Sequence, residues 1–268
     1  MAMIARRLRF VACFAASTGL VTAAALGAAL AAGATGFRDR APAGRVASAC
    51  ARALLRVWGV RLQVVGGPWP TVAGVGGRQV VWISNHTNAL DVFVVCALGL
   101  PRTRYLLSRW LRVVVPLWAL GEVIGIFWTP PQALRARRVA LFRRVTRELR
   151  RSGESVFLTP EGARIRTGRI GPFNKGAFHL AVALRAPIVP LYVETPPATD
   201  PGMGLDVGAG VVRVHVGAPI DTGGWRLEEV AQRRDEVQAL YAAWTPATSS
   251  SADRPAWAAS RPTGPGGG

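Results

Sequence analysis

The amino-terminal part of the chain carries two apolar patterns of different kinds. Phe10 to Ala34 is an apolar run rich in Ala and Gly, with arginines before and after it. About 20 apolar residues are enough for a helix to span a bilayer, so this run predicts a membrane anchor. The alternative is a cleaved signal peptide, because small residues near Ala32 suit a signal peptidase. Arginines at both ends leave the orientation of an anchor open.

Arg45 to Trp58 follows the second pattern, in which arginines recur among Ala, Leu and Val. This spacing predicts an amphipathic helix. Such a helix either lies in the headgroup layer beside anionic lipid or covers the core as an ordinary surface helix. The sequence leaves both possibilities open.

From residue 59 onward, short apolar stretches alternate with segments of helical spacing. The predicted strands are 61–65, 79–83, 105–107, 123–128, 156–158, 188–193 and 211–216. The predicted helices are 88–98, 110–120 (interrupted or bent by Pro116), 134–149, a helix after Lys175, and 226–244. This alternation predicts an α/β fold, a layered mixed sheet with flanking helices, preceded by a membrane-associated helical segment.

Three parts of the chain follow from these patterns. We expect an anchor and amphipathic helix over residues 1–58, one main domain over 59–244, and a disordered tail rich in Ser, Pro and Gly over 245–268. The glycine-rich run at 73–77 lacks the following helix that a dinucleotide-binding loop needs, so it predicts a hairpin-like turn.

Composition narrows the kind of partner. The net charge is +18, which favours anionic partners: a membrane surface, phosphate-bearing substrates or nucleic acid. Half of the residues are hydrophobic, and no nucleic-acid-binding motif is visible, so a membrane surface fits better than nucleic acid. Cys13, Cys50 and Cys96 are too few and too scattered for a disulfide framework or a zinc site.

The first candidate for chemistry lies in the run Ser84 to Asp91, directly after a predicted strand. His86 and Asp91 place an imidazole and a carboxylate in the turn beyond a strand's end, where α/β proteins usually carry their sites. A His held by an Asp can remove a proton from an alcohol near neutral pH. The alternative is a structural His that caps the following helix. His179 and His215 fit ordinary helix-face and strand positions.

Two later runs carry glycine and basic residues. Pro160 to Arg164 follows a strand, and its Gly162 would let the backbone approach an anion that Arg164 binds. Phe173 to Gly176 opens a helix, where backbone amides and Lys175 would attract an anion. Lys175 is the only lysine among 33 basic residues, which hints at a role for a compact ammonium.

Together these motifs resemble the lysophosphatidic acid acyltransferase family over roughly residues 52 to 216. The family's final Val-Pro block is similar to residues 187–191, and its second motif is similar to residues 125–130. The sequence departs from the family at two positions. Ala163 stands where the family usually has Thr, and Pro130 stands where the family has an arginine.

The resemblance implies a membrane-associated acyltransferase with a glycerolipid acyltransferase-like fold. It implies transfer of a fatty acyl group from acyl-CoA or acyl-carrier protein to lysophosphatidic acid, giving phosphatidic acid, with no cofactor or metal. His86 is expected to act as general base and Asp91 to orient it. The residues expected to bind the acceptor are Glu161, Gly162, Arg164, Lys175 and Gly176. The expected location is the cell membrane, with the catalytic domain on the cytoplasmic side.

The missing arginine at 130 leaves alternatives open. Arg135 or Arg109 could substitute for it, or the acceptor could be another lysolipid such as a lyso-ornithine lipid. The region between Leu111 and Phe127 could line a groove for the acyl chain. A basic membrane-binding protein without activity, and a nucleic-acid binder, are the remaining alternatives.

Overall fold

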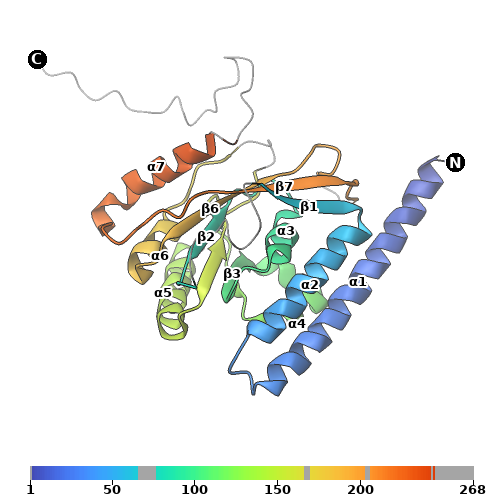
Figure 1. Ribbon diagram of the computed structural model, residues 1–268, viewed down its shortest axis with the longest axis horizontal. Helices are drawn as coiled ribbons and strands as arrows, with labels where there is room; N and C mark the ends of the chain where they lie inside the picture. The colour runs from blue at the N-terminus through green and yellow to red at the C-terminus, as the bar shows by residue number, and fades with distance from the viewer. Residues whose placement is uncertain (1, 66–76, 166–169, 203–205, 243, 245–268) are drawn as a thin grey trace, which may run out of the picture.

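The computed structural model describes residues 2–65, 77–165, 170–202, 206–242 and 244. Residues 73–76 of the predicted hairpin-like turn and the tail from 245 onward lie outside the described residues. A seven-stranded sheet forms the centre of the molecule, with helices on both faces (Figure 1). The predicted α/β class and the mixed, layered sheet are confirmed.

The sheet is parallel apart from one antiparallel pair. The strand order is β1-β7-β6-β2-β5-β3-β4, and β6 and β7 are the antiparallel neighbours. The strands are β1 Val60–Val65, β2 Val81–Ser84, β3 Thr103–Ser108, β4 Phe127–Thr129, β5 Ser155–Leu158, β6 Ile188–Glu194 and β7 Gly210–Val216. Strands β2, β5 and β6 are neighbours and parallel, so their carboxyl ends meet at one edge of the sheet.

Seven α-helices and two short 3-10 helices are described. They are α1 Ala2–Ala34, α2 Ala41–Val57, α3 Asp91–Leu98, η2 Arg109–Val113, α4 Val115–Ile124, α5 Arg135–Ser152, α6 Gly176–Leu184, η3 Leu227–Glu229 and α7 Val230–Ala242. Alternation along the strands supplies a separate core to each face of the sheet. Trp82 and Phe157 pack with α2 and α3, whereas Val81 and Ile83 pack with α5, α6 and α7.

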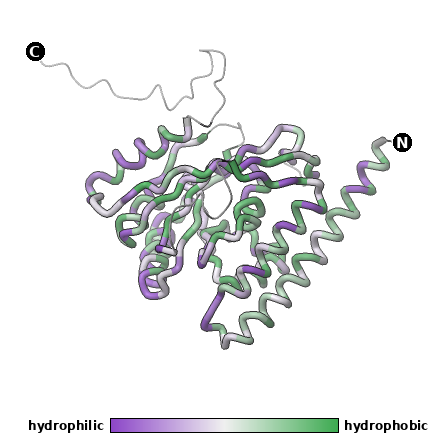
Figure 2. The backbone as a smooth tube through the Cα atoms, viewed as in Figure 1, coloured by the Kyte–Doolittle hydropathy of each residue, from purple (hydrophilic) through white to green (hydrophobic). Residues whose placement is uncertain are grey.

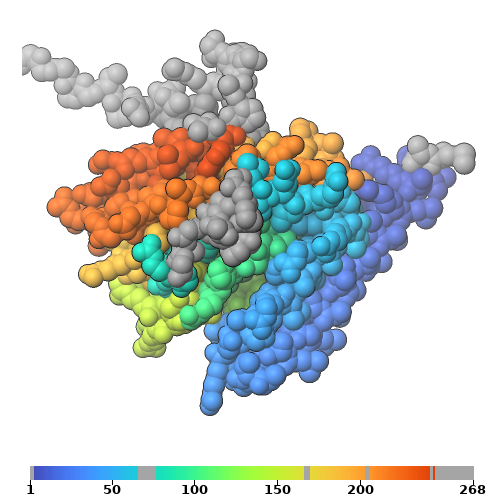
Figure 3. All heavy atoms as spheres, in the orientation of Figure 1, coloured from blue at the N-terminus to red at the C-terminus, as the bar shows by residue number. Residues whose placement is uncertain are grey.

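Small residues hold α1 against the rest of the molecule. Ala24, Ala28 and Ala32 recur every four residues and are buried together with Ala43 and Ala47 of α2. Small side chains let two helices approach closely. These N-terminal helices form one flank of the molecule (Figure 3). Among the described residues, α1 is the one helix long and apolar enough to cross a membrane, judged by length and composition, and it is largely hydrophobic in Figure 2.

Two predicted elements between residues 110 and 128 are wrong in their bounds. The helix predicted at 110–120 is interrupted, since a 3-10 helix ends at Val113 and α4 begins at Val115. Pro116 lies in the first turn of α4. Proline is tolerated at that position because the first N–H groups of a helix have no intrahelical partner. The predicted strand at 123–128 shrinks to β4, since α4 extends to Ile124 and ends at Gly125 with φ +77°.

Candidate active site

His86 and Asp91 are in contact at the carboxyl edge of the sheet. His86 lies just beyond β2, and its Nδ1 is 3.1 Å from Oδ2 of Asp91, the first residue of α3. The Asp91 side chain is buried at 2% exposure, whereas the imidazole is 29% exposed. When Nδ1–H donates to the carboxylate, Nε2 is left as the proton acceptor of the neutral ring. The pair therefore has the geometry of an oriented general base.

The Asp91 carboxylate also organises the turn that carries His86. Its Oδ2 accepts hydrogen bonds from the backbone N–H groups of Thr87 and Asn88, both at 2.9 Å. Burial raises the pKa of Asp91, and the contact with His86 and these two backbone hydrogen bonds oppose that rise. The capping alternative for His86 finds no support, because the N-cap of α3 is Leu90 and no side chain caps it.

The loop after β5 contacts both the backbone N–H and the backbone carbonyl of His86. Glu161 Oε1 accepts from the His86 N–H at 3.4 Å, and the Ile165 N–H donates to the His86 carbonyl at 2.8 Å. These two contacts bracket Arg164, a half-buried residue next to Ile165. The fold therefore brings together the Ser84–Asp91 and Pro160–Arg164 motifs, about 75 residues apart in the sequence, as expected for one site.

Glu161 lies within the protein rather than at its surface. It is 4% exposed, and burial, together with the nearby charge of Asp91, raises the pKa of its carboxyl to about 8. A neutral carboxyl that contacts the His86 backbone fits a bracing role for this loop. Its expected contact with the acceptor stays a prediction.

Gly162 has a backbone conformation and surroundings that exclude a side chain. Its φ is +70°, and a Cβ at this position would lie 2.8 Å from both Asn174 Nδ2 and Gln132 Nε2. The Asn174 amide in turn donates to the carbonyls of Pro160 and Glu161. Asn174, which belongs to the Phe173–Gly176 motif, thus holds the loop through these hydrogen bonds.

Lys175 and Gly176 have different roles in the fold. Lys175 is exposed at the N-cap of α6, which leaves its ammonium free to meet an anion. A Cβ on Gly176 would lie 2.7 Å from the Phe142 ring, so this glycine lets α5 and α6 pack closely. Its expected contact with the acceptor stays a prediction.

The structure identifies two residues that the sequence did not single out. The buried Asn85 donates to the Val193 carbonyl at 2.9 Å and accepts from the Val193 N–H at 2.7 Å, which fixes the chain just before His86 to β6. Its place beside His86 was the only available signal. The second residue, Arg138 on α5, is half-buried, and nothing in the sequence sets it apart from the other arginines of that helix.

Arg138 lies between Pro130 and the Gly162 loop. Its Nη1 donates to the Pro130 carbonyl at 3.2 Å, and its Nη2 is 3.9 Å from the position that a Cβ on Gly162 would take. Burial lowers the pKa of its guanidinium. Arg109 and Arg135, the expected substitutes for the arginine at 130, are both exposed. Arg138 thus places a guanidinium close to the Gly162 loop.

An apolar cavity of about 60 Å³ lies between α2, α3, α4 and the sheet. Val92 of α3, one residue after Asp91, is part of its wall. The region expected to line an acyl-chain groove contributes Leu117, Leu120, Gly121, Ile124 and Ile126. The wall of the cavity thus includes a residue next to Asp91 in the sequence.

Comparison with known proteins identifies the family to which the central part of the chain is similar. The acyltransferase family profile matches residues 64–194. A 1-acyl-sn-glycerol-3-phosphate acyltransferase of Cocos nucifera is 26% identical over 163 residues, which cover 61% of this chain and 53% of that protein. A chloroplastic 1-acyl-sn-glycerol-3-phosphate acyltransferase of Brassica napus is 33% identical over 143 residues, covering 52% and 40%. The chain thus spans about half the length of the curated relatives it matches.

A solved structure shares the fold. The crystal structure of the 1-acyl-sn-glycerophosphate acyltransferase PlsC of Thermotoga maritima superposes with a TM-score of 0.59 at 18% identity, covering 86% of this chain and 97% of that one. The matched region contains the His86 turn and the Glu161 loop, whose contact is described above. Residues 64–194 therefore form an acyltransferase family domain, and this domain is similar in sequence to 1-acyl-sn-glycerol-3-phosphate acyltransferases.

Proposed function

We propose that this protein is an O-acyltransferase that acylates the free hydroxyl of lysophosphatidic acid and produces phosphatidic acid. The observation that carries the proposal is the 3.1 Å contact between His86 Nδ1 and the buried Asp91 carboxylate, next to the Glu161–Arg164 loop. The donor is a fatty acyl thioester of coenzyme A or of acyl-carrier protein. No metal or cofactor takes part in the proposed reaction.

The proposed reaction uses His86 twice. As the acceptor hydroxyl oxygen attacks the thioester carbonyl carbon, His86 Nε2 accepts the hydroxyl proton. Asp91 orients the ring and stabilises the imidazolium that forms. When the tetrahedral intermediate collapses, the carbon–sulfur bond breaks and the departing thiolate takes the proton from Nε2. The ester is then complete and the imidazole is neutral again.

The acceptor's phosphate is proposed to lie over the Gly162 loop. Arg164 and Lys175 supply two cations at this edge of the sheet, and Arg138 supplies a third in place of the arginine that the family has at residue 130. Guanidinium groups bind phosphate through paired, charge-assisted hydrogen bonds. The acyl chain is proposed to lie against the apolar residues around Val92, where the cavity of about 60 Å³ widens when the chain binds.

The proposed location is the cell membrane. Helix α1 has the length and composition of a membrane-crossing helix. Its small residues are buried against α2 and α4, so cleavage after Ala32 would expose a packed apolar surface. Retention of α1 is therefore proposed. A catalytic domain on the cytoplasmic side fits both thioester donors, which are made in the cytoplasm.

The proposal is tested with purified protein, lysophosphatidic acid and labelled acyl-CoA. We expect His86→Ala to lower the rate of phosphatidic acid formation on the order of 100- to 10,000-fold, the usual loss for a general base. His179→Ala is the matched control, because His179 is an exposed histidine on α6. Equal product from wild type and His86→Ala would reject His86 as the base.

Pro130 is the observation that favours a different acceptor. If Arg138 does not replace the missing arginine, the site holds a less strongly anionic head group, such as that of a lyso-ornithine lipid. The same assay with both acceptors decides between them by their kcat/KM values. No transfer to either acceptor would leave a membrane-binding protein without activity.

A further inference from the structure

A second cavity, of about 710 Å³, opens at the edge of the sheet opposite to His86. Helix α3 starts at Asp91 beside His86 and runs for eight residues, about 12 Å, to Leu98. The cavity is lined by that far end of α3, by the start of β3 and by the turn between α1 and α2. Its charged part therefore lies away from His86, although its apolar wall borders the smaller apolar cavity described above.

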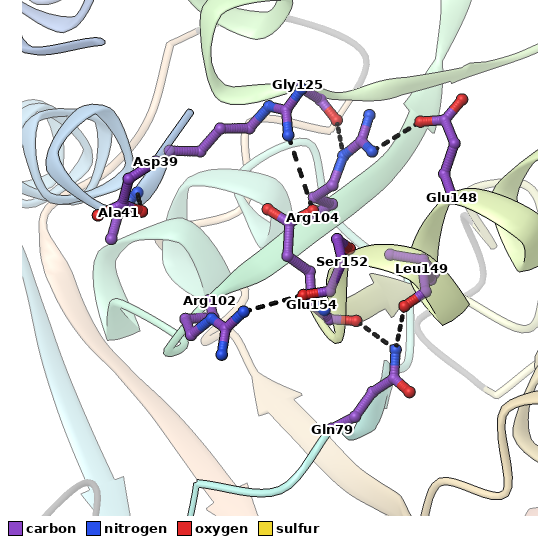
Figure 4. A network of polar contacts seen from close by, with 11 residues as sticks. Asp39, Ala41, Gln79, Arg102, Arg104, Gly125, Glu148, Leu149, Ser152 and Glu154 are labelled. Atoms are coloured by element: carbon purple, nitrogen blue, oxygen red, sulfur yellow. Dashed lines mark hydrogen bonds and ion pairs between the residues drawn. The ribbon is translucent and has the colours of Figure 1, made fainter. Parts of the chain in front are cut away.

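Arginine dominates the charge of this second cavity. Its charged lining residues are Arg38, Asp39, Arg40, Arg45, Arg52, Arg102 and Glu154. Five cations against two anions leave a formal charge of +3. Moreover, Asp39 is engaged, since its Oδ1 accepts from the Ala41 N–H at 2.9 Å, and Glu154 lies 3.7 Å from Arg40 (Figure 4).

The side chains of Arg38 and Arg45 differ from those of the other arginines in this cavity. Arg52 donates to Ser48 and to the Ala97 carbonyl, and Arg102 donates to the Ser152 carbonyl. For the guanidinium groups of Arg38 and Arg45, which are exposed, the described residues provide no hydrogen bond or ion pair. Two guanidinium groups at the rim of the cavity are thus available to a ligand.

Arg40, which lines the cavity, also lies close to the buried Arg104, which does not line it. Near Gly125, the Nε atoms of Arg40 and Arg104 lie 2.7 and 3.0 Å from the position that a Cβ would occupy. Arg104 is buried and donates to Gly125 and Glu148, as Figure 4 shows. Burial, and to a smaller extent the charge of Arg40, lowers the pKa of Arg104. An anion bound beside Arg40 in the cavity would offset the charge that Arg40 brings close to Arg104.

Part of the remaining wall is apolar, and an apolar wall distinguishes a lipid from a free anion as the ligand. Ala47, Cys96, Tyr105 and Ile124 line both this cavity and the apolar cavity beside the candidate active site. A free phosphate would use only the arginines, whereas an anionic lipid would also cover the apolar wall. The cavity adjoins the turn after Ala34, where α1, the candidate membrane-crossing helix, ends. Basic pockets beside membrane helices suit lipid head groups.

We propose that this second cavity binds the phosphate head group of an anionic membrane phospholipid, with Arg38 and Arg45 as its main contacts. The lipid's chain lies against the apolar wall around Ala47 and Ile124. This wall is shared with the cavity proposed for the acyl chain of the reaction. Binding of the head group by Arg38 and Arg45 does not require acyl transfer, so a binding test can fail while the proposed function holds.

The test is a lipid titration of the full chain in nonionic detergent, followed by intrinsic fluorescence and by the thermal unfolding midpoint. Phosphatidylglycerol is the probe and phosphatidylcholine the zwitterionic reference. We expect phosphatidylglycerol to raise the midpoint, and the double variant Arg38→Gln/Arg45→Gln to weaken its binding at least about tenfold, the loss of one charged hydrogen bond. The Arg164→Ala variant should bind it like wild type.

The matched control removes the same charge elsewhere. Arg143→Gln/Arg147→Gln changes two exposed arginines on α5. Equal weakening by both double variants would overturn the proposal in favour of a general surface charge effect. Inorganic phosphate that raises the midpoint as much as phosphatidylglycerol would overturn the lipid as the ligand. Equal effects of the two phospholipids would overturn the site altogether.

Discussion

Substitution of Arg138 tests whether an arginine on α5 does the work that the family assigns to residue 130. Two variants are compared, Arg138→Ala and the double variant Arg138→Ala/Pro130→Arg. The guanidinium of Arg138 already lies beside both relevant elements, 3.2 Å from the Pro130 carbonyl and 3.9 Å from the Cβ position of Gly162. A phosphate bound over the Gly162 loop would be within its reach.

The expected loss follows from the strength of a charged hydrogen bond. One such bond contributes about 1.5–3 kcal/mol, which corresponds to about a 10- to 150-fold rise in KM for lysophosphatidic acid. The upper half of this range is expected, because Arg138 is half-buried and part of its desolvation has already occurred on folding. Loss of the bond to the Pro130 carbonyl should cost about 1 kcal/mol of folding stability.

The assay compares lysophosphatidic acid with monoacylglycerol, which has the same hydroxyl group but no phosphate. Arg138→Ala should raise KM for the first acceptor and leave both kinetic constants for the second unchanged. Arg137→Ala, an exposed neighbour on the same helix, should change neither. The reasoning is refuted if Arg138→Ala affects both acceptors equally, because that result indicates a structural role. Partial recovery in the double variant would tie the effect to residue 130.

Two further predictions concern the loop that carries Glu161. The pKa of Glu161 is raised from 4.5 to about 8, so between these pH values the folded state binds more protons than the unfolded state. The free energy of unfolding therefore falls as the pH rises through this range, by at most about 1.4 kcal/mol per pH unit. Urea unfolding should show that Glu161→Gln removes this part of the slope; an unchanged slope would contradict it. Gly162→Ala should lower stability by about 1–3 kcal/mol and reduce activity. Gly153→Ala, at φ +64° with open space around it, should cost only the backbone part, and equal losses would exclude the contacts with Asn174 and Gln132.

Local sequence patterns predicted the structure correctly where residues close in the chain determine it. β2 alternates Val81, Trp82 and Ile83 between the two cores, so its apolar run was recognisable without knowledge of its partners. The His86–Asp91 contact is equally local, because both residues belong to one turn whose backbone Asp91 itself holds. The strand order placed the Glu161 loop beside that turn, as the motifs implied.

Packing between distant segments decided what the sequence could not show. Gly176 matched a family motif, yet its contact is with the Phe142 ring of another helix. The boundary between α4 and β4 depends on the left-handed conformation of Gly125, next to which Arg40 and Arg104 pack. The arginine-lined cavity exists only because the α1–α2 turn lies over the end of α3. None of these contacts leaves a periodic signal.

We interpret Pro130 and Arg138 together: the guanidinium that is missing at residue 130 is supplied by Arg138 instead. An arginine at 130 would bring a second guanidinium toward the place that Arg138 occupies, and two cations in a partly buried pocket repel each other. Pro130→Arg in the otherwise unchanged chain should therefore not improve the KM for lysophosphatidic acid, although it should improve it once Arg138 is Ala. This sign change is non-additivity between neighbouring residues. Additive effects would mean that the two positions act on different parts of the acceptor, and Arg138 would then not be the replacement.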